Sequence, residues 1–85
     1  MGIVTRVVPD DQVQAEARSL ALTLAAGPTK ALGAAKRLLE SGMTESLETQ
    51  MELEGRAITD ASRTADAREG IRAFLEKRPA AFTGE

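Results

Sequence analysis

Large apolar side chains are scarce in this chain, and that scarcity limits what it can build alone. Leu, Ile, Val and Phe together number 18 of 85 residues, whereas Ala alone contributes 15. Burying a large aliphatic side chain stabilises a fold by about 1.5–3 kcal/mol, while ordering the backbone of one residue costs about 1–2 kcal/mol. The large side chains therefore make a thin core for a free monomer. We expect the chain either to oligomerise or to be a piece of something larger.

Glycine and proline divide the chain into an arm, a helical region and a tail. The β-branched run before Pro9 predicts an extended arm over residues 1–9. Apolar residues then recur at spacings of three and four, which is the periodicity of one helix face. The pattern predicts an all-α fold, with four short helices and tight connections over residues 10–78. Residues 79–85 follow the last helix and are expected to form a loose tail.

Capping residues mark the expected helix boundaries. Gly27 is expected in the left-handed conformation after the first helix, because glycine takes that conformation without strain. Thr44 or Ser46 is expected to cap the third helix, since a hydroxyl can accept from the first free backbone N–H groups. Asp66 and Glu69 have capping-box spacing, with Asp replacing the usual Ser or Thr, and are expected to open the fourth helix.

The fourth helix carries the one cluster that suggests a ligand. Phe74 and Lys77 are three residues apart and are expected to share a helix face near the C-terminus, which places an apolar ring beside a cation. Such a pair suits a ligand with an apolar middle and an anionic end. A core Phe followed by a Lys that the helix dipole attracts gives the same pattern, so spacing leaves both interpretations open. The expected inward face consists of Ala67, Gly70, Ile71, Phe74 and Leu75.

Composition excludes several classes of function. The chain has no Cys and no His, which removes thiol nucleophiles, Cys/His zinc sites and Ser-His-Asp triads. A net charge of −2 and two aromatic residues argue against a nucleic-acid partner. No apolar run approaches the roughly 18 residues of a membrane span, and the N-terminus lacks a signal-peptide layout. We therefore expect a cytoplasmic protein without a metal, a cofactor or a membrane partner.

Five stretches resemble consecutive parts of the crotonase (enoyl-CoA hydratase/isomerase) superfamily. They are residues 2–10, 26–32, 35–39, 46–48 and 65–78. The last stretch, ADAREGIRAFLEKR, is the most specific, and the closing Phe82-Thr83-Gly84 is similar to the phenylacetate-degradation isomerases of that superfamily. The resemblance covers essentially the whole sequence in order.

The resemblance implies a position within a longer enzyme. In that family an N-terminal ββα spiral supplies the oxyanion-hole N–H groups and the acid–base carboxylates, and no residue here matches them. The matching region is the C-terminal helical domain, which builds the trimer or hexamer contact and caps the acyl-CoA site. The resemblance therefore implies an inactive piece of an acyl-CoA hydratase or isomerase, with no catalytic residue of its own. It also implies that Phe74 lines the acyl tunnel and that Lys77 approaches the CoA phosphates, with Arg78 as the alternative phosphate partner.

A second interpretation remains open at this point. The same chain could be a free-standing helical module that binds a protein partner through its Ala-rich faces. A reading frame that continues upstream of Gly2 into a ββα spiral would exclude the free-standing module. The acyl group and the choice between hydratase, isomerase and lyase chemistry depend on residues that this sequence does not contain.

Overall fold

The computed structural model describes residues 2–85 and shows four α-helices and one short 3-10 helix. Their order is η1 (Asp10–Gln12), α1 (Val13–Ala25), α2 (Thr29–Ser41), α3 (Leu47–Ser62) and α4 (Ala65–Leu75). The described residues contain no strand. The prediction of an all-α fold with four short helices is confirmed.

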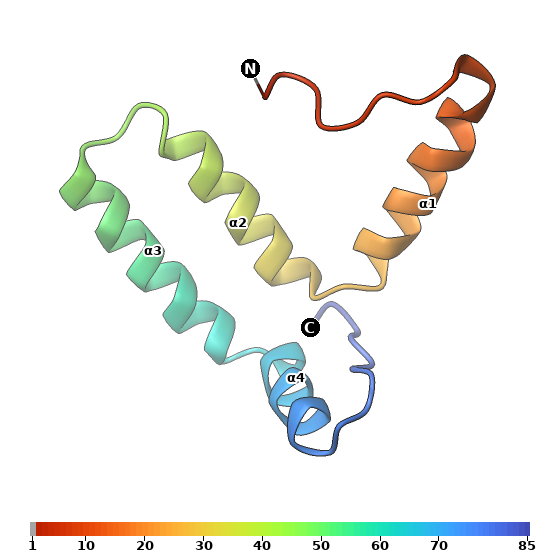
Figure 1. Ribbon diagram of the computed structural model, residues 1–85. Helices are drawn as coiled ribbons and strands as arrows, with labels where there is room; N and C mark the ends of the chain where they lie inside the picture. Colours follow the sequence, from red (N-terminus) through yellow and green to blue (C-terminus); the bar gives the residue numbers. More distant parts are fainter. Residues whose placement is uncertain (1) are drawn as a thin grey trace.

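The helices form an open slab. Figure 1 shows α2 and α3 side by side, α1 set apart from them, and α4 below with the C-terminal segment beside it. The principal extents are 42 × 39 × 19 Å and the radius of gyration is 16.0 Å. A compact domain of this length has a radius of gyration of about 12 Å. The arrangement is therefore much looser than that of an independent globular domain.

The hairpin of α2 and α3 is the best-packed part of the chain. Its turn is held by the Gln50 side chain, whose Nε2 donates to the Leu38 carbonyl at 2.9 Å and whose Oε1 accepts from Ser41 Oγ at 2.8 Å. At Gly42, a Cβ would lie 3.2 Å from that Leu38 carbonyl and 3.5 Å from Gln50 Nε2. Glycine therefore lets the chain turn closely beneath the Gln50 amide.

Hydroxyl caps begin the last two helices. Ser46 accepts a hydrogen bond from the Thr49 N–H at 3.2 Å and starts α3, as the sequence predicts. Thr64 accepts from the Ala67 N–H at 3.0 Å and starts α4. The expectation that Asp66 opens α4 is therefore wrong. Asp66 lies inside the first turn, and its carboxylate is used elsewhere.

Gly27 has a different role from the one that its position suggests. It does not adopt a positive φ, so the expected left-handed cap is wrong. A Cβ at Gly27 would lie 3.0 Å from Leu32 Cδ1 and 3.2 Å from the Leu24 carbonyl. The glycine is needed because α2 returns closely past the end of α1.

Almost nothing is buried within the chain. Of the described residues, only Ala73 and Asp66 are buried, and large apolar side chains of every helix are exposed. The predicted inward face of α4 is therefore wrong for this chain by itself: Ile71, Phe74 and Leu75 are exposed. Ala73 is buried, while the large apolar residues of α4 remain mostly exposed.

The C-terminal segment is ordered against α4, contrary to the expectation of a loose tail. Backbone N–H groups of Ala81, Thr83 and Gly84 donate to carboxylates of α4. The Phe82 ring covers Gly70, where a Cβ would lie 3.5 Å from Cε1 of the ring. The segment folds back because α4 presents two carboxylate acceptors to its backbone and Gly70 leaves room for the Phe82 ring.

Candidate functional site

The turn that ends α4 is a Schellman motif. The Arg78 N–H donates to the Ala73 carbonyl at 3.0 Å, and the Lys77 N–H donates to the Phe74 carbonyl at 3.2 Å. This pair of bonds satisfies two carbonyls that the helix would otherwise leave unpaired. Because α4 ends at Leu75, Lys77 lies beyond the helix, and the expectation that Phe74 and Lys77 share a helix face is wrong.

Lys77 occupies a conformation that favours glycine. Its φ is 53°, and it is the one residue other than glycine with a positive φ in the described chain. The left-handed conformation costs a residue with a side chain roughly 1–2 kcal/mol. Backbone strain of this kind persists where the surroundings hold it, and it concentrates at functional sites. The Schellman motif places its C′ residue in this conformation, so the positive φ of Lys77 follows from the turn that ends α4.

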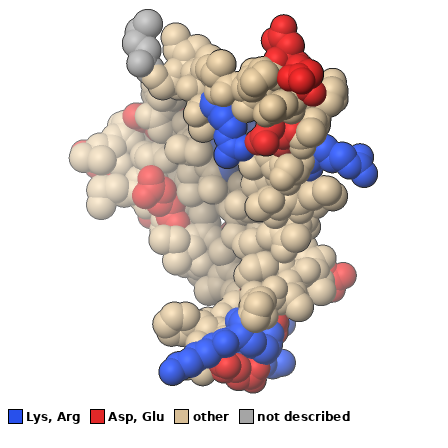
Figure 2. Space-filling model, turned by 45° about the vertical axis from the view of Figure 1, so that its right-hand side comes forward, with Lys and Arg blue, Asp and Glu red and all other residues tan. Residues whose placement is uncertain are grey.

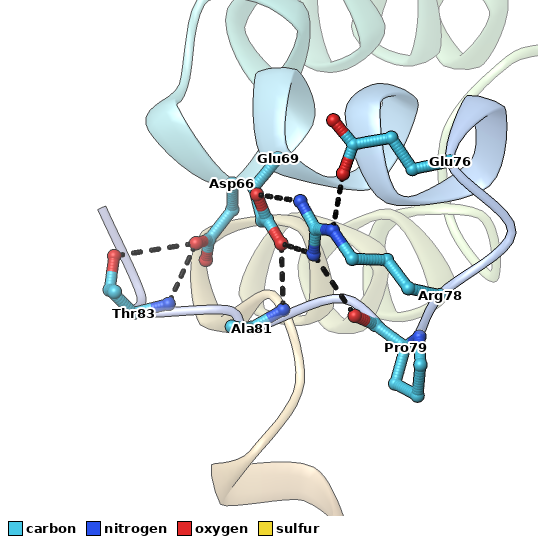
Figure 3. A network of polar contacts seen from close by, with 7 residues as sticks. All are labelled: Asp66, Glu69, Glu76, Arg78, Pro79, Ala81 and Thr83. Carbon is cyan, nitrogen blue, oxygen red and sulfur yellow. Dashed lines mark hydrogen bonds and ion pairs between the residues drawn. The ribbon is translucent and has the colours of Figure 1, made fainter.

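The neighbouring cation, Arg78, is fully engaged. Its guanidinium contacts both carboxylate oxygens of Glu69, at 2.6 and 3.1 Å, and one oxygen of Glu76 at 2.5 Å (Figure 3). It also donates to the Pro79 carbonyl at 3.1 Å. By contrast, Lys77 makes no ion pair with any of residues 2–85. Lys77 is therefore the cation of this turn that remains available to an anionic ligand.

The ion pair shifts the pKa values of both partners. The hydrogen bond from Arg78, followed by that from the Ala81 N–H, lowers the pKa of Glu69 from 4.5 to about 2. The same contacts, first with Glu69 and then with Glu76, raise the pKa of Arg78 above its usual value. Both groups remain charged across the neutral range, so the contact between α4 and the C-terminal segment persists there.

An apolar surface lies on α4 beside this turn. Phe74 is 83% exposed, and Ile71 and Leu75 are exposed with it. Of the two predicted site residues, Phe74 lies in the last turn of α4, whereas Lys77 lies after the helix in the left-handed conformation. An exposed ring followed by an unpaired ammonium suits an amphiphilic anion, and within the described residues Phe74 is not buried.

Asp66 is a residue that the sequence interpretation placed incorrectly. Its carboxylate accepts from the Thr83 and Gly84 N–H groups, each at 2.8 Å, and from Thr83 Oγ1 at 3.4 Å. The residue is 4% exposed, and each of its carboxylate oxygens has a partner. The signal in the sequence was an acidic residue one helical turn before Glu69, on the same face.

A groove between α2 and α3 is the second feature that the sequence interpretation missed. Its volume is about 640 Å³, and charged and small apolar residues line it. The charged lining residues are Lys30, Arg37, Arg56 and Asp60. Arg56 is already paired with Glu52 at 2.8 Å. The groove is partly open to solvent rather than enclosed.

Neither a metal centre nor a membrane span emerges from the residues that the structure covers. No group of three acidic side chains gathers in a way that could hold a metal ion. Across the same residues, none of the helices combines the length and the apolar character that crossing a bilayer requires.

Comparison with known families identifies the chain. The sequence model for the family described as enoyl-CoA hydratase/isomerase matches residues 1–85, which is the whole sequence. The chain belongs to the enoyl-CoA hydratase/isomerase family. The resemblance that the five sequence stretches carry is thereby confirmed at the level of the family.

Relatives of this hydratase/isomerase chain are much longer than it is. It is 42% identical over 84 residues to a probable enoyl-CoA hydratase of Rhodobacter capsulatus, covering 99% of this chain and 33% of the relative. It is 43% identical to the 1,2-epoxyphenylacetyl-CoA isomerase of Escherichia coli, covering 99% of this chain and 32% of that isomerase. The chain thus spans about a third of the length of the curated relatives that it matches.

Solved structures of the family show the same arrangement of helices. An enoyl-CoA hydratase of Geobacillus kaustophilus superposes with a TM-score of 0.93 at 33% identity, over 99% of this chain and 32% of that protein. An enoyl-CoA hydratase/isomerase of Mycobacterium abscessus gives a TM-score of 0.85 at 37% identity, over 99% and 35% of the two chains. The open slab is therefore the shape that this region has within complete crotonase-fold enzymes.

Proposed function

We propose that the chain is the C-terminal helical part of an enoyl-CoA hydratase or isomerase, where it contributes subunit contacts and caps the acyl-CoA site. Exposure of the apolar helix faces is the observation that carries this proposal. The described residues expose 7257 Å². A compact chain of this mass exposes about 4,900 Å². The surplus, about 2,400 Å², is surface that other parts of a larger assembly would cover.

The size of this surplus favours more than one contact. A partner in a standard protein interface loses about 800 Å² of accessible surface. The surplus is about three times that value, which fits a chain that packs both on its own N-terminal domain and on a neighbouring subunit. Figure 2 shows a broad uncharged area on this face between the charged side chains at the top and at the bottom, with acidic side chains at its left edge. A trimer or a hexamer of the complete enzyme would supply such contacts.

The turn after α4 is the part that we assign to substrate. Phe74 offers an exposed ring to an acyl chain, and Lys77 offers an unpaired ammonium to a CoA phosphate. A Lys ammonium binds a phosphate as a point charge. It therefore needs less exact alignment with the CoA phosphate than the two parallel hydrogen bonds of an Arg guanidinium do. The ligand class is accordingly an acyl-CoA thioester. Residues 10–78 act as the helical domain, and residues 1–9 lead out of the preceding spiral domain.

One experiment tests the enzymatic role directly. The gene would be sequenced upstream of Gly2, and the protein would be expressed both as the complete reading frame and as residues 1–85. Turnover of crotonyl-CoA is expected for the complete protein and not for residues 1–85, because none of these residues matches the oxyanion donors or carboxylates of the family. Turnover by residues 1–85 above a control without protein would contradict the proposal.

The upstream sequence also tests the alternative, a free-standing interaction module. A ribosome-binding site and an upstream stop codon directly before Met1 would support the module and oppose the enzyme. The length of the relatives favours the enzyme, since each is about three times as long as this chain.

A further inference from the structure

Two carboxylates on one face of α4 hold the segment that follows the helix. Asp66 binds the backbone N–H groups of Thr83 and Gly84, and Glu69 binds the Ala81 N–H at 2.9 Å and the Arg78 guanidinium. The Glu69 side chain is 19% exposed and Asp66 is 4% exposed, so solvent competes weakly for these bonds. We call residues 78–84 the strap.

The strap is attached at both of its ends. Figure 3 shows it running back along α4, with the Arg78 guanidinium beside the Glu69 carboxylate and Thr83 beside Asp66. Arg78 is the residue directly after Lys77, and Glu76, which also contacts Arg78, is the residue directly before it. Lys77 is thus fixed from both sides in its left-handed conformation. The Schellman hydrogen bonds hold this conformation through the backbone, and the attachment of Arg78 and Ala81 to Glu69 fixes the chain that leaves the turn.

We propose that Asp66 and Glu69 are positioning residues of the acyl-CoA site: by clamping the strap, they hold the backbone turn from which Lys77 reaches the ligand. Neither residue touches substrate. The proposal rests on the proposed function, because it assigns the ligand of Lys77 from it. A purely structural role of the clamp would change the stability of the fold, whereas a positioning role changes the affinity for CoA while the chemical step continues.

The test uses the complete enzyme with the variants Asp66→Asn and Glu69→Gln. Glu52→Gln is the matched control, because it also converts a carboxylate to an amide and breaks an ion pair to arginine, on the exposed side of α3. Limited trypsin digestion reports on the clamp. Trypsin cleaves after Lys77 when the turn opens, while the Arg78–Pro79 bond resists cleavage. Steady-state kinetics with crotonyl-CoA, carried out in parallel, report on the site.

Release of the strap should appear in both measurements. In Glu69→Gln, cleavage after Lys77 should rise about tenfold, because a bidentate charge-assisted pair is lost. The KM for crotonyl-CoA should rise about three- to tenfold with kcat nearly unchanged, which is the pattern of lost ground-state binding. Asp66→Asn should act in the same direction, and Glu52→Gln should change neither value.

A double substitution separates positioning from general destabilisation. Lys77→Gly removes the ammonium that the clamp positions, so adding Glu69→Gln to it should leave KM unchanged. An additive effect in the double variant would overturn the positioning role, and so would faster cleavage with an unaltered KM. Unaltered cleavage in both carboxylate variants would overturn the clamp itself. If trypsin digests the variants of the complete enzyme as the clamp predicts but the unsubstituted enzyme does not turn over acyl-CoA, the proposed function is contradicted instead.

Discussion

Replacing Lys77 with glycine is expected to stabilise the turn after α4 and to weaken CoA binding at the same time. The native φ of 53° costs a residue with a side chain roughly 1–2 kcal/mol, which glycine avoids. Glycine loses more backbone entropy on folding, by about 0.4–1 kcal/mol. The expected net effect is a gain of about 0.5–1 kcal/mol in the free energy of unfolding.

The effect on binding has the opposite sign. A hydrogen bond between an ammonium and a phosphate contributes about 1.5–3 kcal/mol, and the lower value suits an exposed pair that salt screens. Since 1.4 kcal/mol corresponds to about a tenfold change, the KM for CoA substrates should rise about tenfold with kcat nearly unchanged. Lys77→Ala is the matched variant: it should show the same change in KM without the gain in stability.

Two assays on the complete enzyme check this prediction. Denaturant unfolding compares the stability of the glycine and alanine variants, and steady-state kinetics compare a CoA substrate with its dephospho-CoA counterpart. The substitutions should affect the CoA substrate and spare the dephospho substrate, and the effect should shrink at high salt. An equal loss on both substrates would refute the phosphate contact. A glycine variant less stable than the alanine variant would refute the assignment of backbone strain.

Three further predictions follow from the same features. Residues 1–85 alone should form dimers or larger species, because their apolar faces are exposed; a mass near 9.0 kDa by light scattering at high concentration would contradict this. Phe74→Ala in the complete enzyme should weaken discrimination between acyl lengths, measured as the ratio of kcat/KM for short and long acyl-CoA substrates. Because the pKa of Glu69 is lowered from 4.5 to about 2, the stability that its carboxylate contributes is present above pH 4.5 and is lost as the pH falls toward 2. The hydrogen-exchange protection of the Ala81 amide should fall over that range, and Glu69→Gln should abolish this pH dependence.

The local part of the fold could be predicted from the sequence because local rules decide it. The spacing of the apolar residues and the hydroxyl at Ser46 suffice for the four helices and for the start of α3. Gly27 was assigned wrongly because glycine serves two purposes, and the sequence does not show that Leu32 returns within 3.0 Å of it. That contact depends on how α2 crosses the end of α1, which is a tertiary property.

The sequence singles out Phe74 and Lys77 as candidate site residues, and their role stays a prediction, but it does not give their geometry. The apolar ring and the cation at Phe74 and Lys77 stand out in the sequence, but the helix ends at Leu75, so the face that they were expected to share does not exist. Asp66 looked like a cap because capping and strap binding both require a carboxylate early in a helix. Its partners lie 17 and 18 residues further along the chain, beyond the reach of any local pattern.

The thickness of the slab has a consequence for how tolerance to mutation should be interpreted. A helix with its side chains is about 10–12 Å across, so a body 19 Å thick is less than two helices deep. Most positions therefore face outward within this chain, and a mutational scan that scores only the folding of residues 1–85 should find them permissive, Phe74 and Leu75 included. In the complete enzyme that we propose, the same substitutions would remove contacts with substrate at Phe74 and with other parts of the protein elsewhere.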